Sequence, residues 1–187
     1  MYLVVGLGNI GSEYQKTRHN FGFLLLDKLI EDYHLKHISK KFHSEIFCGE
    51  IANQKIIAIK PQTFMNRSGI AVSEVANFYK IPLKNIIVLH DDIDLAFIKL
   101  KIKIGGGSGG HNGLKSIDEM IGKDYLRLRL GVGKSQNNMI STADHVLQNF
   151  TQEEFELVEK INSKISALFP HLINNETDKF LNKIHQI

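Results

Sequence analysis

The sequence predicts a single α/β domain in which helices pack on both faces of a twisted, mixed β-sheet. Short apolar runs typical of buried strands alternate with longer stretches in which apolar residues recur at helical spacing. Two further segments, residues 99–104 and 125–130, alternate between charged and apolar residues, as strands with one exposed face do. The resulting order, β-α-β-β-α-β-β-α-β-α, indicates both parallel and antiparallel strand pairs.

Size and composition agree with this class. The 187 residues are enough to bury a substantial core, and we expect one domain over residues 1–187. The net charge of +3 permits an anionic partner without requiring one. The single cysteine, Cys48, cannot form an internal disulfide, and no apolar run approaches the ~20 residues of a membrane span. Because the N-terminus also leads directly into a strand, without the pattern of a signal peptide, we expect a cytoplasmic protein.

The first strand, residues 3–5, runs directly into a glycine-rich turn. Gly6, Gly8 and Gly11 have the spacing of a dinucleotide-binding fingerprint. That fingerprint requires a helix at its third glycine, whereas the apolar helical stripe here begins only at Phe23. The pattern therefore disfavours a nucleotide cofactor, and we expect no cofactor. A nucleotide-dependent enzyme stays as an alternative. Failure of the protein to bind NAD, FAD or ATP would exclude it.

The other elements follow from periodicity and turn residues. The pattern predicts five helices. The first spans residues 20–33, the second contains residues 71–79 and ends before Pro82, and the third begins after residue 113. The fourth follows the capping box at residues 151–154, and the fifth lies around residues 180–184. It predicts further strands at residues 46–51, 55–60, 85–89, 99–104 and 125–130. We expect residues 34–43 to be a solvated loop, residues 134–144 to be polar and mobile, and the helix behind the capping box to stop at Pro170.

Polar side chains follow four of the predicted strands. They lie at residues 9–20, 65–66, 90–94 and 111–112. Because ligands of open α/β sheets bind outside the carboxyl ends of the strands, we expect these groups to meet in one site.

Within that site, His19 and Asp91 can form a general-base unit. A neutral imidazole takes a proton from water, and a carboxylate fixes its tautomer and stabilises the imidazolium. The amides of Asn9, Asn66 and Asn112 can hold substrate oxygens and donate to a developing oxyanion. Since no serine or cysteine nucleophile stands out, attack by an activated water is the simplest chemistry.

Each of these features also has a simpler structural explanation. His19 alone is compatible with a structural histidine that bonds to its own turn, and Cys48 in an apolar strand is best explained as an inert core thiol. Asp91 and its acidic neighbours could bind a metal, but His90 has no partner histidine at helical spacing, so we expect no metal.

The basic strand at residues 99–104 allows two interpretations. Lys99, Lys101 and Lys103 share one face and lead into a glycine-rich run, residues 105–110. This is either a solvated face followed by a hinge, or a track for phosphates with free backbone N–H groups beside it. In the second case a non-catalytic RNA-binding module is the alternative to an enzyme.

Several long motifs together resemble those of bacterial peptidyl-tRNA hydrolase. They are Gly-Leu-Gly-Asn (6–9), Tyr14, Thr-Arg-His-Asn (17–20), Lys-Pro-Gln-Thr-Phe-Met-Asn (60–66), Ser-Gly (68–69), His-Asp-Asp-Ile-Asp (90–94), Gly-Gly-His-Asn-Gly-Leu (109–114) and Arg-Leu-Arg-Leu-Gly-Val-Gly (127–133). The resemblance runs in order from residue 3 to about residue 150. The chain departs from the usual family pattern at Ile10, residues 96–98, Ser108 and residues 134–144.

The resemblance implies a monomeric, metal-free hydrolase that cuts the ester between a nascent peptide and the 3′ ribose of its tRNA. It implies that His19 is the base, that Asp91 orients it, and that Asn66 helps to position the water and the oxyanion. For the substrate it implies peptide and ester contacts by Asn9, Asn20, Met65 and Asn112, a tRNA-end contact by Tyr14, phosphate contacts by Lys101, Lys103 and Arg129, and gating of the cleft by His111.

Overall fold

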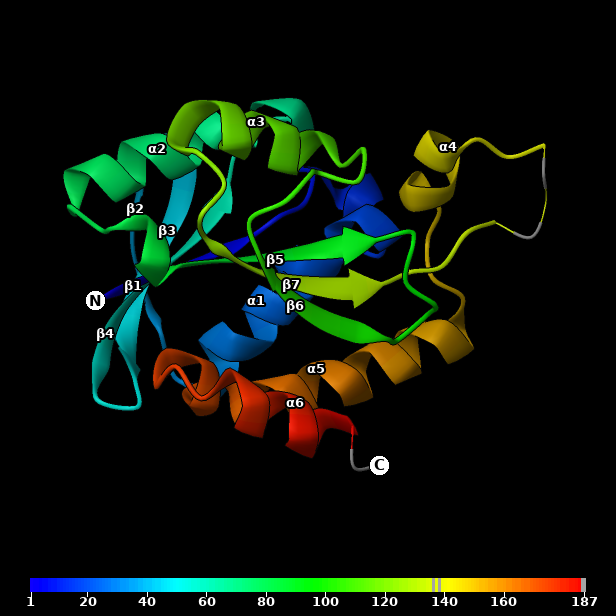
Figure 1. Ribbon diagram of the computed structural model, residues 1–187. Helices are drawn as coiled ribbons and strands as arrows, with labels where there is room; N and C mark the ends of the chain where they lie inside the picture. Colours follow the sequence, from blue (N-terminus) through cyan, green and yellow to red (C-terminus); the bar gives the residue numbers. More distant parts are fainter. Residues whose placement is uncertain (136, 138, 186–187) are drawn as a thin grey trace.

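A seven-stranded mixed sheet forms the centre of the computed structural model, which describes residues 1–135, 137 and 139–185 (Figure 1). Its strand order is β2-β3-β4-β1-β5-β7-β6. The central pairs β4–β1, β1–β5 and β5–β7 are parallel, and the outer pairs are antiparallel. The strands are β1 (Tyr2–Gly6), β2 (Lys36–Lys41), β3 (Ser44–Ile51), β4 (Gln54–Pro61), β5 (Ile86–Asp92), β6 (Leu100–Ile104) and β7 (Leu126–Gly131). The predicted α/β class with a mixed sheet is confirmed.

Helices cover both faces of this sheet. They are α1 (Phe21–Asp32), α2 (Ser68–Phe78), α3 (Asn112–Ile121), α4 (Thr142–Leu147), α5 (Gln152–Ile173) and α6 (Thr177–His185). Helices α2 and α3 lie on one face, α1, α5 and α6 lie on the other, and α4 stands apart beside the carboxyl ends of the strands (Figure 1). Because both faces are covered, β1 is apolar throughout: Val4 joins the core under α1 and α5, and Leu3 and Val5 join the core under α2 and α3.

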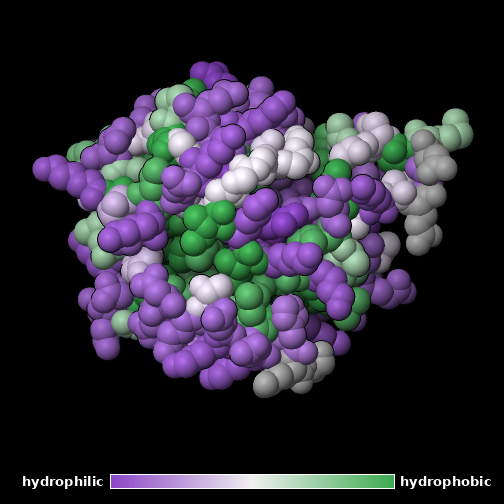
Figure 2. Space-filling model, in the orientation of Figure 1, coloured by the Kyte–Doolittle hydropathy of each residue, from purple (hydrophilic) through white to green (hydrophobic). Residues whose placement is uncertain are grey.

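Apolar side chains remain visible where the sheet edge is uncovered. The face shown in Figure 2 is mostly hydrophilic, with apolar residues gathered in the band between the two helical layers. The edge strand β6 runs along this band, and its Ile104 is 66% exposed. No helix among the described residues is long and apolar enough to cross a membrane.

The prediction of a solvated loop over residues 34–43 is wrong, because this segment contains the edge strand β2. Its backbone pairs antiparallel with β3, while nearly all its side chains face solvent. Phe42 and His43 both have positive φ, 55° and 49°, and form the tight connection to β3. Lysines on an exposed edge protect it from pairing with other chains, which explains why the strand carries no apolar alternation.

The helix behind the capping box does not stop at Pro170 but continues to Ile173. A proline inside a helix leaves the carbonyl four residues earlier without its N–H donor, here the carbonyl of Ser166. The hydroxyl of Tyr33, just after α1, donates to that carbonyl at 2.7 Å. A tertiary hydrogen bond thus replaces the lost helical one.

Two further boundaries differ from the prediction. The sequence predicts a polar, mobile segment over residues 134–144 and no helix there, but α4 begins at Thr142, where the hydroxyl of Ser141 caps it by accepting from the Asp144 N–H at 3.1 Å. Residues 136 and 138 of this segment lie outside the described residues. Strand β5 runs on to Asp92, so His90 and Asp91 lie within the strand rather than after it. Cys48 in β3 is half-buried rather than fully inside the core.

Candidate active site

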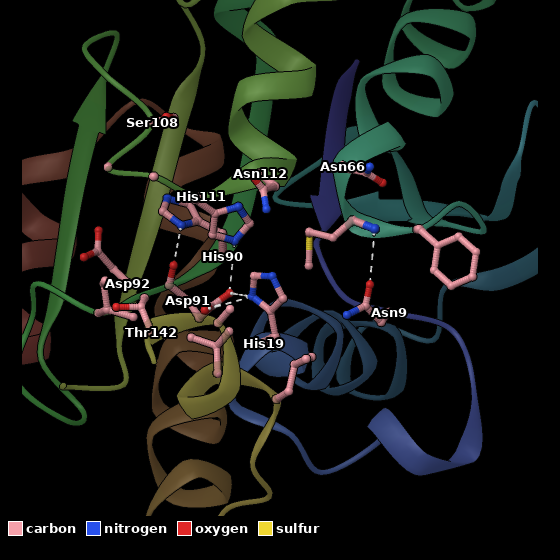
Figure 3. Close-up of a pocket in the computed structure, with 18 residues that line it drawn as sticks. Asn9, His19, Asn66, His90, Asp91, Asp92, Ser108, His111, Asn112 and Thr142 are labelled. Atoms are coloured by element: carbon pink, nitrogen blue, oxygen red, sulfur yellow. Dashed lines mark hydrogen bonds and ion pairs between the residues drawn. The ribbon is translucent and has the colours of Figure 1, made fainter. Parts of the chain in front are cut away.

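The four predicted polar groups meet in one cavity of about 650 Å³ at the carboxyl ends of the central strands (Figure 3). Strand β1 leads into Asn9, β5 carries Asp91, and the start of α3 contributes His111 and Asn112. One wall comes from α4, which the sequence analysis did not include in the site; it contributes Thr142, Ala143, Val146 and Leu147. No sequence motif marks these four residues as part of a site, because they reach the cavity only through the tertiary packing of α4.

His19 and Asp91 form the expected pair. Nδ1 of His19 lies 2.9 and 3.0 Å from the two carboxylate oxygens of Asp91 (Figure 3). Since an ionised carboxylate only accepts, Nδ1 carries the proton and Nε2 is left as an acceptor. Burial lowers the pKa of His19, but the charge and hydrogen bond of Asp91 raise it more, so this pKa lies above its ordinary value of 6.5.

A second histidine shares the same carboxylate. Nδ1 of His111 accepts from the backbone N–H groups of Gly113 and Leu114 at 3.1 and 3.3 Å, and so caps α3. The proton of His111 must therefore sit on Nε2, which donates to Asp91 at 3.0 Å. Burial would raise the pKa of Asp91, but the two imidazoles and their hydrogen bonds hold it well below its ordinary range. In this arrangement His111 supports Asp91, and its gating of the cleft stays a prediction.

The same three side chains also have the composition of a metal site. His19, Asp91 and His111 each direct one ligand atom to within 4.8 Å of the others. A metal at Nε2 of His111 would displace its proton, while Nδ1 already accepts two backbone N–H groups. That ring would then carry no proton on either nitrogen. The hydrogen-bonded arrangement therefore fits these residues better than a metal ion does.

His90 is a buried neighbour of Asp91, from the expected group at residues 90–94, to which the sequence assigned no role. It donates from Nδ1 to the backbone carbonyl of Asp91 at 2.7 Å. Burial lowers the pKa of His90 to about 3, so the ring is neutral near pH 7. Its ring packs edge-on against His111, with the centroids 5.1 Å apart. His90 thus fixes the end of β5 from which Asp91 projects.

Asn9 is held by three hydrogen bonds. The side chain of Asn20 accepts from its backbone N–H at 2.8 Å and donates to its carbonyl at 2.9 Å. The side-chain oxygen of Asn9 accepts from the Met65 N–H at 3.2 Å, which leaves the amide nitrogen on the side of the cavity that faces His19 (Figure 3). Asn20 therefore positions Asn9 from behind.

The other predicted contact residues are less constrained. Asn112 and Asn66 are exposed residues of the cavity lining, and Asn66 lies on the same side of the cavity as Asn9, opposite His19 (Figure 3). Neither Tyr14 nor Asn20 belongs to the part of the lining that the structure describes. Tyr14 lies in a short 3₁₀ turn, Ser12–Tyr14, after the glycine-rich segment.

The predicted phosphate-binding residues lie at the β6–β7 edge of the sheet. Lys101 is opposite Arg129, and Lys103 is opposite Arg127. Lys103, Arg127 and Arg129 line a smaller cavity of about 260 Å³, which we call the basic cavity. Nε of Arg129 donates to Asp92 at 2.8 Å, and Asp92 also lines the 650 Å³ cavity, so the guanidinium of Arg129 is oriented beside that cavity.

The sheet topology, together with a histidine–aspartate pair at the carboxyl ends of the strands and a basic edge beside it, has the groups that an α/β hydrolase needs to activate water. The family model for peptidyl-tRNA hydrolase matches residues 3–187, and the chain belongs to this family. It is 49% identical to a peptidyl-tRNA hydrolase of Rickettsia canadensis and 47% identical to one of Rickettsia prowazekii, each over 98% of this chain and 100% of the relative. The crystal structure of peptidyl-tRNA hydrolase from Acinetobacter baumannii superposes with a TM-score of 0.92 at 34% identity and covers 100% of this chain and 95% of that one.

Proposed function

We propose that the chain hydrolyses the ester between the peptide and the 3′ ribose of peptidyl-tRNA through a water that His19 activates, and so recycles tRNA during translation. The observation that carries this proposal is the tautomer of His19. Its Nδ1–H is fixed on Asp91 at 2.9 Å, so Nε2 is the nitrogen left to accept a proton. No cofactor, metal or second copy of the chain is needed for this step, and we expect a cytoplasmic monomer.

The reaction then follows two proton transfers. Nε2 of His19 takes a proton from water as the oxygen attacks the ester carbonyl carbon, and Asp91 stabilises the imidazolium that forms. When the tetrahedral intermediate collapses, the C–O bond to the ribose breaks, and the imidazolium returns its proton to the 3′ oxygen. The products are a peptide with a free carboxyl group and a tRNA with a free 3′ hydroxyl.

The oxyanion of the intermediate needs donors that are fixed in advance. Asn9 meets this requirement, because its side-chain oxygen is bonded to Met65 and its amide nitrogen is left for the cavity. Asn66 and Asn112 supply further amides at the rim, and Asn66 also helps to hold the water. One such donor contributes about 3–4 kcal/mol to lowering the barrier.

The tRNA and the peptide of the substrate differ in charge, and so do the surfaces that bind them. Lys101, Lys103 and Arg129 take phosphates of the tRNA, and Tyr14 contacts its end. Amides around Met65 and Asn112 take the peptide next to the ester, in a cleft gated by His111. A free, charged α-amine is poorly matched to neutral amides, which favours peptidyl-tRNA over aminoacyl-tRNA.

The test is release of tRNA from an N-acetylated aminoacyl-tRNA with a chelator present. Wild type is expected to turn over, whereas His19→Ala is expected to lose turnover and keep tRNA binding. Lys101→Ala and Lys103→Ala should weaken binding and lower its salt dependence. Turnover that survives in His19→Ala would overturn the mechanism. A folded wild type that binds tRNA without turnover would instead indicate an RNA-binding module.

A further inference from the structure

Arg127 is a basic residue of β7 whose side chain lies inside the protein. This side chain is 2% exposed, against 24% for that of Arg129, two positions further along the strand. One guanidinium nitrogen of Arg127 donates to Oδ1 of Asp118 in α3 at 2.7 Å, and the hydroxyl of Tyr125 donates to the same oxygen at 2.7 Å. The guanidinium also lies over the Tyr125 ring, 4.8 Å from its centroid. Arg127 is poorly suited to take a phosphate of the tRNA, because its withdrawal would leave Asp118 buried and unpaired.

A second nitrogen of the same guanidinium holds the loop between β6 and α3. Nη1 of Arg127 donates to the backbone carbonyl of Gly107, in the glycine-rich run at residues 105–110, at 3.0 Å. A Cβ added at Gly107, Gly109 or Gly110 would meet no atom within 4 Å, so packing does not hold this part of the loop. In the part of the chain that the structure describes, the bond from Arg127 is the only hydrogen bond between the loop and a helix or strand.

This loop is connected to the catalytic residues. Ser108 and Gly109 line both the 650 Å³ cavity and the basic cavity, and residues 110–111 continue the lining of the larger one. The carbonyl of Ser108 accepts from the N–H of His111 at 3.0 Å, and Nε2 of His111 donates to Asp91 at 3.0 Å. The position of the loop therefore affects where α3 begins and how His111 meets the carboxylate that orients the base.

We propose that Arg127 is a positioning residue for the hydrolysis, which fixes the glycine-rich loop and the start of α3 by binding Gly107 and Asp118 together. A guanidinium suits this role, because its planar fork presents several donors in fixed directions, whereas a lysine ammonium is a point charge on a flexible stem. Arg127 acts on the reaction without contacting the tRNA, unlike Arg129. Its effect on turnover rests on the proposed function, and its effect on the loop does not.

The first test is Arg127→Lys, which keeps a positive charge for Asp118 but loses the fork. It is expected to lower kcat for N-acetyl-aminoacyl-tRNA about tenfold to a hundredfold, since a misplacement of about 1 Å can cost about 100-fold. The affinity for deacylated tRNA and its salt dependence should stay unchanged. Amide hydrogen exchange should become faster at His111, Gly113 and Leu114, whose N–H groups are hydrogen-bonded at the start of α3, and stay unchanged in β1. Wild-type kcat or unchanged exchange in Arg127→Lys would overturn the proposal.

A second variant, Asp118→Asn, leaves every cation of the protein in place. Its amide oxygen still accepts from Tyr125, but the charge that holds Arg127 is gone, so kcat should fall by less than in Arg127→Lys while tRNA affinity stays at the wild-type value. If Arg127 instead took a phosphate in competition with Asp118, the same change would strengthen tRNA binding and steepen its salt dependence. That result, with an unchanged kcat, would refute the positioning role.

The matched control is Tyr33→Phe, which removes the hydrogen bond to Ser166 in α5, on the opposite face of the sheet from α3 (Figure 1). It lowers stability without touching the loop, so kcat, tRNA binding and exchange at residues 111–114 should stay unchanged. A loss of kcat as large as in Arg127→Lys would show that turnover only follows stability, and would refute the assignment. Wild type without turnover would overturn the proposed function, while exchange at residues 111–114 would still decide whether Arg127 holds the loop.

Discussion

Replacing Asp91 with asparagine should weaken the base by removing the negative charge that stabilises its imidazolium. Oδ1 of Asp91 accepts from Nε2 of His111 at 3.0 Å, and the cap of α3 fixes the proton on that nitrogen. In Asp91→Asn the amide oxygen must therefore keep the Oδ1 position. The amide nitrogen then takes the position of Oδ2, 3.0 Å from Nδ1 of His19, while the amide oxygen stays 2.9 Å from the same nitrogen. Nδ1 of His19 keeps one acceptor, but an N–H group replaces the second carboxylate oxygen and no negative charge stabilises the imidazolium that forms.

The size of the loss follows from the value of a general base. Such a base contributes about 10²–10⁴-fold to the rate, which corresponds to about 3–5 kcal/mol of barrier at 1.36 kcal/mol per tenfold. The pH dependence should change as well. His19 must be neutral to act, so kcat/KM falls as the pH falls through the pKa of His19, which lies above 6.5 in wild type. Without the carboxylate, only burial acts on this pKa, and the midpoint should move down.

The assay is kcat/KM for N-acetyl-aminoacyl-tRNA between pH 5 and pH 9 for wild type and Asp91→Asn. Asp94→Asn is the control, because Asp94 is an exposed carboxylate that pairs with Lys134. The control should keep both the rate and the midpoint. A wild-type rate in Asp91→Asn, or a reduced rate with an unmoved midpoint, would refute the reasoning.

Three further predictions concern stability. The folded pKa of His90, about 3, lies below its ordinary 6.5, so stability should fall by up to about 1.4 kcal/mol per pH unit as the pH drops from 6.5 towards 3; denaturant titrations should show a shallower fall for His90→Asn. Tyr33→Phe should lower the free energy of unfolding by about 1–3 kcal/mol in the otherwise wild-type protein, and by less when Pro170 is replaced by alanine, because an N–H group then again faces the Ser166 carbonyl. Equal losses in the two backgrounds of a double-mutant cycle would contradict this. Gly69→Ala should lower stability by about 1–3 kcal/mol in thermal unfolding, because its Cβ would lie 2.1 Å from a backbone oxygen of α3; an unchanged melting temperature would show that the helices can separate freely.

The differences between prediction and structure have a common cause. Strand β2 has no apolar alternation, since its side chains are solvated and only its backbone is paired. Helix α5 passes through Pro170 because a tyrosine from another part of the chain satisfies the free carbonyl. Both depend on a distant partner, which local pattern does not record.

The site shows the same division between local chemistry and tertiary arrangement. The sequence indicated His19 and Asp91 as base and orienter, because imidazole and carboxylate followed two different strands. It did not indicate that His111 shares Asp91, since the shared oxygen depends on how α3 docks against β5. Nor did it indicate that Asn20 lies behind Asn9, which follows from the turn between β1 and α1.

The sequence by itself determined the class of the fold, the strands β3 and β4, the helices α1, α2 and α3, and the histidine and aspartate that meet in the site. These follow from periodicity, capping and turn chemistry, which act over a few residues. Only the tertiary structure decided the tautomers of the two histidines, the contribution of α4 to the cavity, and the position of the basic cavity beside it. Each of these features depends on contacts between segments that lie far apart in the chain. No single segment encodes these contacts or the order of the strands in the sheet.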